Sequence, residues 1–386
     1  MKDVQVCLIS AQPIPNLVPL IFDQPEEAVF LVSPEMKGRS GRLGEVVKAR
    51  GIKVREIEIP AYDFGEVSLV CDRLLSGTAQ GDCSLTLNVT GGTKISALAA
   101  FQSFYFSEGN PRIIYLDSTS SRLMEISPQE KTRKISGNLV RLREYLASYG
   151  FRMTSSGKPA AGFGQRRPFL ESLAQILIRD EALLGRFNSA VERGKTGAGY
   201  VNIDLSALGE KGDELAGVLE KCRAARRTGN NNLNIPSDEM IFFCGGGWLE
   251  EYVYQVVHSL GIKKADVSIN VEGSWEGSGR KPTRNEFDLH FLWRNRLHLI
   301  SCKTANLGRR DEGGTPGKEA IYELSSLRDR AGGLFGRSML VSARKLAGHD
   351  RRRAENWGIE VVEGNRILQL RQHLRSWLGL KNQFGC

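Results

Sequence analysis

The sequence lacks several features that would assign it to a familiar class. It has no CxxC pair among its seven scattered cysteines, which argues against a disulfide framework or a zinc knuckle. No apolar run approaches the ~18 residues of a membrane-spanning helix. The N-terminus has neither the cationic start nor the cleavage site of a signal peptide. We therefore expect a cytoplasmic protein with reduced thiols and no membrane partner.

Common cofactor motifs are also missing. The chain contains neither a GxxxxGK[ST] Walker loop nor a GxGxxG dinucleotide fingerprint after its first apolar run. Its five histidines show no HExxH spacing, so His290 and His298 are expected to be residues of a β-hairpin rather than metal ligands. These absences exclude the standard nucleotide-hydrolase, dehydrogenase and zinc-protease signatures.

Positive charge is abundant and unevenly placed. The chain has 386 residues, enough for two or three domains, and a net charge of +9. Residues 1–150 hold 17 basic and 17 acidic residues, whereas the remainder holds 36 basic and 27 acidic ones. A polyanion such as nucleic acid is the natural partner of the second part. The alternative is a basic surface that serves solubility alone.

The first 150 residues alternate short apolar runs with helical patterns. Strands are expected at 4–10, 28–33, 53–60, 84–89, 111–117 and 122–127, and helices at 42–51, 64–76, 94–106 and 139–150. This alternation is typical of a doubly wound α/β domain. Small and polar residues then predict a linker at 151–165, a helical or winged-helix-like insert at 166–235, and a last domain at 236–386.

Two loops at the carboxyl ends of predicted strands suggest a phosphate site. The run 84–89 leads directly into TGGTK, residues 90–94, and then into a helix. Glycines let a ligand approach the backbone, and a helix N-terminus offers free N–H groups to phosphate. The loop at 10–16, SAQPIPN, would flank the same crevice. The alternative is a tight turn with a capping threonine.

Both loops resemble those of CARF domains, the CRISPR-associated Rossmann-like sensors of cyclic oligoadenylates, over roughly residues 1–145. The resemblance implies a homodimer that holds cyclic tetra-adenylate between its subunits, which suits a two-fold symmetric ring. By position it points to a set of ligand-binding residues: Ser10, Gln12, Asn16, Thr90, Gly91, Gly92, Thr93 and Lys94.

A second constellation lies in the C-terminal part. Asp288 interrupts an alternating apolar run, and after a turn near 294–296 a second run ends in Ser301-Cys302-Lys303. Paired as a hairpin, these runs bring Asp288 and Lys303 together. In the upstream helix, 248–261, Glu250 borders the apolar face, and Glu251 is expected to point into solvent. Two carboxylates and a lysine suit a divalent cation and a water nucleophile; a half-buried ion pair is the alternative.

This arrangement resembles the PD-(D/E)xK, restriction-endonuclease-like nucleases over about residues 240–345. The resemblance implies manganese or magnesium held by Glu250, Asp288 and the Cys302 carbonyl, with Lys303 orienting water. It adds Glu286, Glu319 and Tyr322 as accessory residues. One departure stands out, because Ser301 occupies the position of an acid and is a poorer metal ligand. The catalytic set is thus Glu250, Asp288, Ser301 and Lys303.

Together the two resemblances match the CARF–nuclease ancillary effectors of type III CRISPR systems. They imply a cyclic tetra-adenylate-activated, metal-dependent endonuclease that cleaves DNA or RNA in antiviral defence. The expected nucleic-acid contacts are basic residues: Arg309, Arg310, Arg344 and Lys345. The rival is a cyclic-oligoadenylate-gated DNA-binding regulator whose nuclease has decayed at Ser301 and whose insert is a winged helix. An RxxxxH ribonuclease is disfavoured, because its only suitable match, 344–349, follows a strand.

Overall fold

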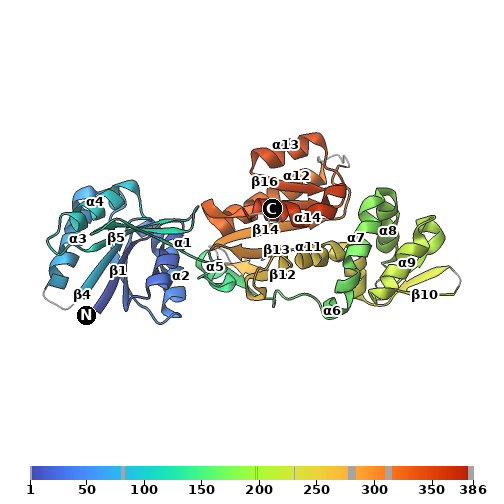
Figure 1. Cartoon of the computed structure of the whole chain (residues 1–386), viewed down its shortest axis with the longest axis horizontal. Coiled ribbons are helices and arrows are strands. Elements are labelled where there is room, and N and C mark those ends of the chain that lie inside the picture. The colour runs from blue at the N-terminus through green and yellow to red at the C-terminus, as the bar shows by residue number, and fades with distance from the viewer. Residues whose placement is uncertain are drawn as a thin grey trace, which may run out of the picture.

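The fold consists of three units arranged in a row, seen in a computed structural model that describes residues 2–79, 83–195, 197, 199–229, 231–276, 284–308 and 315–380. The N-terminal α/β unit lies at one end, the unit built on the Asp288 hairpin lies in the centre, and the insert lies at the other end (Figure 1). No helix among the described residues is long and apolar enough to cross a membrane.

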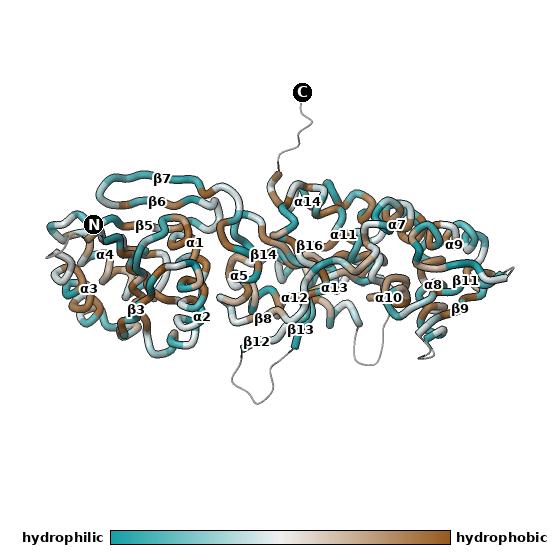
Figure 2. The backbone as a smooth tube through the Cα atoms, turned by 90° about the horizontal axis from the view of Figure 1, so that it is seen from below, coloured by the Kyte–Doolittle hydropathy of each residue, from teal (hydrophilic) through white to brown (hydrophobic). Residues whose placement is uncertain are grey.

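A seven-stranded sheet forms the N-terminal unit, in the order β3-β2-β1-β4-β5-β6-β7. Its strands are β1 (Lys2–Leu8), β2 (Glu27–Val32), β3 (Lys53–Glu58), β4 (Cys83–Asn88), β5 (Arg112–Asp117), β6 (Arg122–Ser127) and β7 (Lys131–Lys134). The first five are parallel, and β6 and β7 extend the sheet antiparallel. The β6–β7 hairpin is a hydrophilic edge (Figure 2), which discourages pairing with other strands.

Helices cover both faces of this sheet, as expected for a doubly wound domain. They are α1 (Ile14–Asp23), α2 (Lys37–Lys48), α3 (Phe64–Ala79) and α4 (Lys94–Tyr105). Side chains of β1 alternate between the two faces: Val6 and Leu8 pack in the core with α3 and α4, and Cys7 packs in the core with α1 and α2. Helix α1 is not among the helices that the sequence predicts, because its prolines hide the pattern.

The central unit is a six-stranded mixed sheet, in the order β16-β15-β14-β13-β12-β8. Its strands are β8 (Phe151–Met153), β12 (Val267–Trp275), β13 (Arg284–Trp293), β14 (Arg296–Lys303), β15 (Arg337–Ser342) and β16 (Ile359–Glu363). Its helices are α5 (Leu142–Ser148), α10 (Asp238–Phe242), α11 (Trp248–His258), α12 (Pro316–Gly332), α13 (Gly348–Asn356) and α14 (Leu370–Trp377). A π-turn, Phe243–Gly247, joins α10 to α11.

The predicted start of the linker is wrong. Residues 151–153 form β8, which pairs with β12 at the edge of the central sheet. Phe151 is fully buried and packs edge-on against Trp275 and Phe287. A buried aromatic cluster thus fixes this segment to the central unit, and the linker begins only after it.

The hairpin turn between β13 and β14 also joins the two units. Arg294 and Asn295 both have positive φ, 53° and 56°, as a two-residue hairpin turn requires. The Asn295 side-chain oxygen accepts from the backbone N–H groups of Leu139 (2.7 Å) and Val140 (3.1 Å). This turn of the central unit thus provides the hydrogen-bond acceptor for two backbone N–H groups in the segment that leaves the N-terminal sheet.

The insert combines helices with a small antiparallel sheet, whose first strand precedes the last helix. Its elements are α6 (Phe163–Arg166), α7 (Leu170–Arg179), α8 (Glu181–Gly194), β9 (Val201–Asp204), α9 (Gly212–Lys221), β10 (Arg226–Thr228) and β11 (Asn232–Ile235), with strand order β10-β11-β9. This order is compatible with the winged-helix-like insert, which stays a prediction. The hydrophobic core of the insert is continuous with that around α11.

A buried ion pair, Arg166 with Glu251, joins α6 to α11. The expectation that Glu251 faces solvent is wrong: it is only 5% exposed and accepts two bonds from Arg166, at 2.9 and 2.6 Å. Burial raises the pKa of Glu251, and Arg166 opposes that effect. The guanidinium also lies over the Phe243 ring, 5.1 Å from its centroid.

Replacing Arg166 by Met should destabilise the C-terminal part strongly, because Glu251 would be left as an unpaired buried charge. The expected loss is about 3–5 kcal/mol, or an apparent Tm about 10 °C lower for a unit of this size. Differential scanning calorimetry measures it. Adding Glu251→Gln in the same chain should recover most of the loss; equal stability of Arg166→Met and the parent would contradict the role of the pair.

Candidate active site and sensor pocket

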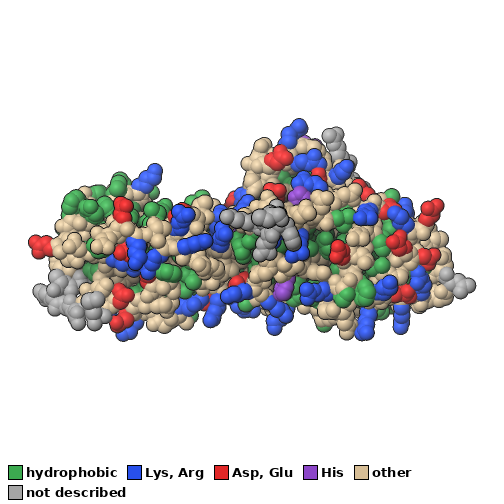
Figure 3. Space-filling model, viewed as in Figure 1, with side chains coloured by type: hydrophobic (Ala, Val, Ile, Leu, Met, Phe, Trp, Pro, Cys, Tyr) green, Lys and Arg blue, Asp and Glu red, His purple; other side chains and the backbone are tan. Residues whose placement is uncertain are grey.

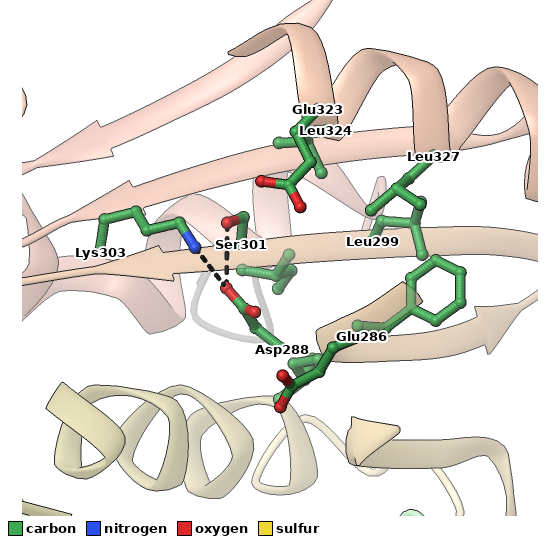
Figure 4. Close-up of a pocket in the computed structure, with 11 residues that line it drawn as sticks. Glu286, Asp288, Leu299, Ser301, Lys303, Glu323, Leu324 and Leu327 are labelled. Carbon is green, nitrogen blue, oxygen red and sulfur yellow. Dashed lines mark hydrogen bonds and ion pairs between the residues drawn. The ribbon is translucent and has the colours of Figure 1, made fainter. Parts of the chain in front are cut away.

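The Asp288 carboxylate lies where the β13–β14 ladder ends. The last backbone pair is Leu289 with Ile300. Beyond it one Asp288 oxygen, Oδ2, accepts from Ser301 Oγ (3.0 Å) and Cys302 N (2.8 Å) and lies 3.5 Å from Lys303 Nζ. Figure 4 shows Lys303 and Ser301 converging on this oxygen. The predicted approach of Asp288 and Lys303 is therefore present in the structure.

The sheet is distorted on the other side of Asp288 as well. Asn270 of β12, which lies opposite Asp288, has a φ of 50° and makes no ladder pair. Phe287 packs in one core, with Phe151 and Trp275, whereas Leu289 packs in the other. The odd-numbered side chains of β13 therefore switch from one face of the sheet to the other between Phe287 and Leu289. Because the ladder is interrupted here, the Asp288 carboxylate is left accessible.

Glu250 comes to this opening from α11. The turn before the helix needs glycine, since a Cβ at Gly247 would lie 2.6 Å from the Phe242 ring. Burial and the nearby Asp288 charge raise the pKa of Glu250 to about 8. A hydrogen bond from Asn270 lowers this pKa but does not offset the increase. Its Oε2 atom is buried without a hydrogen-bond partner. An orphaned buried carboxylate oxygen beside a second carboxylate is the arrangement that a bound cation would satisfy.

The remaining charges of the site oppose one another. Burial lowers the pKa of Lys303, but Asp288 and Glu323 outweigh it, so the net pKa is raised and the ammonium stays charged. Burial and Asp288 raise the pKa of Glu286. These groups line a narrow pocket of about 30 Å³, room for a water or an ion. Its lining includes Glu286, Asp288, Ser301, Lys303 and Glu323.

Glu323 is the acid that sequence reasoning missed. It lies on α12, and its carboxylate is directed toward Ser301 in Figure 4. The sequence pointed instead to its helix neighbours, but Glu319 is exposed and outside the pocket lining. Tyr322 packs on Trp357, with 4.8 Å between ring centroids, and is not part of the pocket lining. A helical pattern cannot tell which of three nearby residues faces a strand that is distant in sequence.

Two of the four predicted nucleic-acid contacts lie within the described residues. Arg344 is half-buried and packs on α8, where a Cβ at Gly185 would meet its guanidinium at 2.4 Å. Lys345 is exposed. Arg309 and Arg310 lie outside the described residues. His290 and His298 are buried in the hairpin, as predicted, and burial lowers the pKa of each to about 3.

The residue types fit a hard divalent cation, although their side chains are not arranged around a common point. Within the described parts of the chain, no three His, Cys, Asp or Glu side chains form a ready-made cluster. Glu250 and Asp288 supply oxygen donors, and the orphaned Glu250 oxygen needs a positive partner. Ser301 instead donates a hydrogen bond to Asp288. The strand position at which the nuclease resemblance implies an acid thus contributes a hydrogen-bond donor here.

The second pocket, of about 410 Å³, lies in the N-terminal unit. Ser10, Gly92 and Thr93 line it, together with residues that the sequence did not single out: Ser33, Glu35, Met36 and Tyr62. Gly91 is required because a Cβ there would lie 2.1 Å from the Leu8 carbonyl oxygen. Lys94 is exposed at the first turn of α4.

Three of the predicted ligand residues have structural partners instead. Asn16 is fully buried and donates to the Leu8 carbonyl (2.8 Å). The Thr90 hydroxyl donates to Asn88 (2.6 Å) and accepts from the Leu116 N–H (2.8 Å). Gln12 points toward the central unit, where its Oε1 accepts from Leu334 N (3.2 Å) and Tyr149 Oη (3.1 Å). Only part of the predicted set therefore faces this pocket.

Comparison with known families separates the two units. Residues 4–145 match the Card1 CARF domain, and residues 237–381 match the Card1-like endonuclease domain. The chain belongs with the CARF-domain endonucleases. The CARF domain thus holds the 410 Å³ pocket, and the endonuclease domain holds Asp288 and Lys303. No curated protein matches the chain in sequence.

Solved structures resemble this CARF-domain endonuclease over nearly its whole length. Protein VC1899 from Vibrio cholerae is 23% identical, with 98% of both chains covered and a TM-score of 0.85. Can2 from Sulfobacillus thermosulfidooxidans, solved with cyclic tetra-adenylate, is 28% identical, with 97% of this chain and 99% of that chain covered and a TM-score of 0.76. A type III CRISPR defence DNA nuclease activated by cyclic oligoadenylate is 19% identical, with coverages of 90% and 46% and a TM-score of 0.57.

The Glu250 carboxyl should make metal-free stability depend on pH. Its folded pKa, about 8, exceeds the ordinary value of 4.5, so the folded state binds the proton more tightly. That stabilisation is complete below about pH 4.5 and is lost as the pH rises through about 8. Glu250→Gln should therefore gain stability relative to the parent across this window, on the order of a few kcal/mol. Thermal unfolding in EDTA measures it; a pH-independent difference would contradict the assignment.

Proposed function

We propose that the chain is a homodimeric endonuclease that cyclic tetra-adenylate activates and that cleaves DNA or RNA in type III CRISPR antiviral defence. The observation that carries this proposal is the convergence of Asp288 and Lys303, with Glu250 beside them, in a chain that also holds a CARF pocket. The likeness to Can2, solved with cyclic tetra-adenylate, supports that ring as the activator. The basic excess of residues 151–386 supports a nucleic-acid substrate.

Manganese or magnesium would be held by Glu250, Asp288 and the Cys302 carbonyl. When bound, such an ion lowers the pKa of water and stabilises charge on the scissile phosphate. Lys303 keeps its proton because of Asp288 and Glu323, so it can bind a phosphate oxygen and orient water. Ser301 and the Cys302 N–H hold Asp288 in place. Burial around Glu250 keeps bulk water away from that side.

An apolar surface on the CARF domain supports dimerisation through a second copy of the chain. Helix α4 exposes Ile95, Leu98 (59%) and Tyr105, continuing into Phe106 (77%), and α3 exposes Leu69. Apolar side chains gather over α4 in Figure 3. A contiguous exposed patch of this kind marks a protein interface. A two-fold axis there would suit a two-fold symmetric cyclic tetranucleotide.

The DNA-binding rival finds little support in the insert. Helix α9, the helix before the small hairpin, exposes Asp213 and Glu214. Arg227 of that hairpin is engaged with Asp213 (3.2 Å) and Glu220 (2.8 Å). An acidic helix whose neighbouring arginine is already paired is poorly suited to DNA phosphates. Ser301 remains the one feature in favour of a decayed nuclease.

Cleavage should require both the messenger and the Asp288–Lys303 pair. Labelled single-stranded RNA, single-stranded DNA and supercoiled plasmid are each incubated with Mn²⁺ or Mg²⁺, with and without cyclic tetra-adenylate. We expect cleavage of at least one substrate with messenger and metal, and none in EDTA. Lys303→Ala and Asp288→Asn should each lower the rate by about a hundredfold or more. Both should still bind the messenger, measured by calorimetry.

The matched control is Lys264→Ala, which changes an exposed lysine of the same domain and should keep the parent rate. Undiminished cleavage by Lys303→Ala would reject the active site. Messenger-dependent binding of DNA without any cleavage would reject the nuclease and favour the regulator.

A further inference from the structure

The strand that normally supplies the second acid of the site offers none in this chain. Ser301 stands at that position, and its hydroxyl donates to Asp288 Oδ2 at 3.0 Å. The neighbouring Cys302 N–H and Lys303 ammonium also face this oxygen. The β14 edge of the pocket is therefore lined by hydrogen-bond donors, and a cation there needs a carboxylate from another element.

Helix α12 crosses the same pocket and carries such a carboxylate. Leu324 and Leu327 of α12 are buried and line the pocket, and Glu323 lies beside them. Figure 4 shows its carboxylate extending from the helix toward Ser301. Among the described residues this carboxylate has no hydrogen bond or close ion pair, although its charge raises the pKa of Lys303 and Glu286. A free carboxylate on a flexible side chain can approach a bound ion.

We propose that Glu323 provides the metal-binding carboxylate that Ser301 cannot, so that this site takes its second acid from helix α12 instead of strand β14. The inference rests on the proposed function and identifies a catalytic residue within it. Glu323, Asp288 and Glu250 then bind the cation from α12, β13 and α11. Among the described residues these carboxylates do not form a preformed cluster, so the proposal requires Glu323 to move toward the ion when it binds.

Exchanging the two positions tests this assignment. Calorimetric titration of the full chain with Mn²⁺ gives a binding constant independent of turnover. Glu323→Gln should weaken Mn²⁺ binding by roughly tenfold or more and reduce cleavage in parallel. Adding Ser301→Glu to Glu323→Gln should restore both, because the carboxylate returns to the pocket from the strand.

The matched control is Asp329→Asn, an exposed acid six residues further along α12, which should leave both measurements unchanged. Glu323→Gln that binds Mn²⁺ and cleaves like the parent would overturn the assignment, as would an equal loss in Glu319→Gln. If the parent protein itself neither binds Mn²⁺ nor cleaves, the proposed function fails instead. The two failures are therefore distinguishable.

A separate set of contacts links the CARF pocket to the same helix. The Ser10 hydroxyl, which lines that pocket, bonds the backbone of Gln12 at N (3.2 Å) and O (3.3 Å). The Gln12 side chain accepts from Leu334 N, just after α12 ends. At Gly333, φ is +53° and a Cβ would lie 2.0 Å from Gln12 Oε1. The Tyr149 hydroxyl also faces Gln12 Oε1 (3.1 Å).

We further propose that Gln12 is a latch that holds the C-terminal end of α12 against the CARF domain. A messenger phosphate that engages the Ser10 hydroxyl competes with the Gln12 backbone for it and so loosens the latch. Gln12 then acts on the catalytic helix through Gly333 and Leu334, and it is a positioning residue rather than a ligand contact. This inference also rests on the proposed function, but its contacts are independent of those that carry the Glu323 assignment.

Gln12→Ala should raise cleavage without messenger by about tenfold, since it removes hydrogen bonds that hold the C-terminal end of α12. By linkage it should also bind cyclic tetra-adenylate more tightly by a similar factor, measured by calorimetry. Tyr149→Phe removes one of the two donors to Gln12 Oε1. It should raise the basal rate and the messenger affinity by smaller factors. Gln129→Ala, an exposed glutamine of the CARF domain, is the control. An unchanged basal rate, or weaker messenger binding, in Gln12→Ala would overturn the latch.

Discussion

The half-buried Asp288 carboxylate is the constraint around which the endonuclease domain is arranged. Removing a carboxylate from water is costly unless donors replace it, and β14 supplies three: the Ser301 hydroxyl, the Cys302 N–H and the Lys303 ammonium. Those donors are available because the ladder ends at Leu289 and Ile300. Glu250 has no such set, since one of its oxygens stays unpaired. The domain thus satisfies one acid and leaves the other for a cation, at the expense of stability.

Patterns that depend on local periodicity could be read from the sequence. Alternation along 285–303 places Leu297 and Leu299 in one core and Ile300 and Cys302 in the other, so the hairpin and its converging Asp288 and Lys303 were predictable. The strand–TGGTK–helix junction was predictable for the same reason, because turn chemistry is local. Helix α1 was not, since its two prolines mimic a loop although one stands in the first turn, where proline is tolerated.

Features set by tertiary contacts could not be read from the sequence. The assignment of Glu251 to solvent assumed that α11 has one buried face, but its core contacts include both the sheet and α7. Because α11 is covered on two sides, both Glu250 and Glu251 are at least partly buried. Arg166 lies beside Glu251, so Glu251 is the acid that forms the ion pair. Likewise Gln12 belongs to a loop that the CARF resemblance assigns to the ligand, whereas its side chain meets a turn over 300 residues away.

Helix α12 connects the Gln12 contact with the Asp288 site, because contacts from different units hold its two ends. At its start the fully buried Asp350 accepts from the capping Thr315 hydroxyl (2.6 Å) and pairs with Arg353, which anchors that end within the endonuclease domain. Just past its end the Leu334 N–H donates to Gln12 of the CARF domain (3.2 Å). Its 17 residues span about 25 Å, and Glu323 lies near the middle. A movement at the CARF end would therefore pivot about Asp350 and displace Glu323 by roughly half as much.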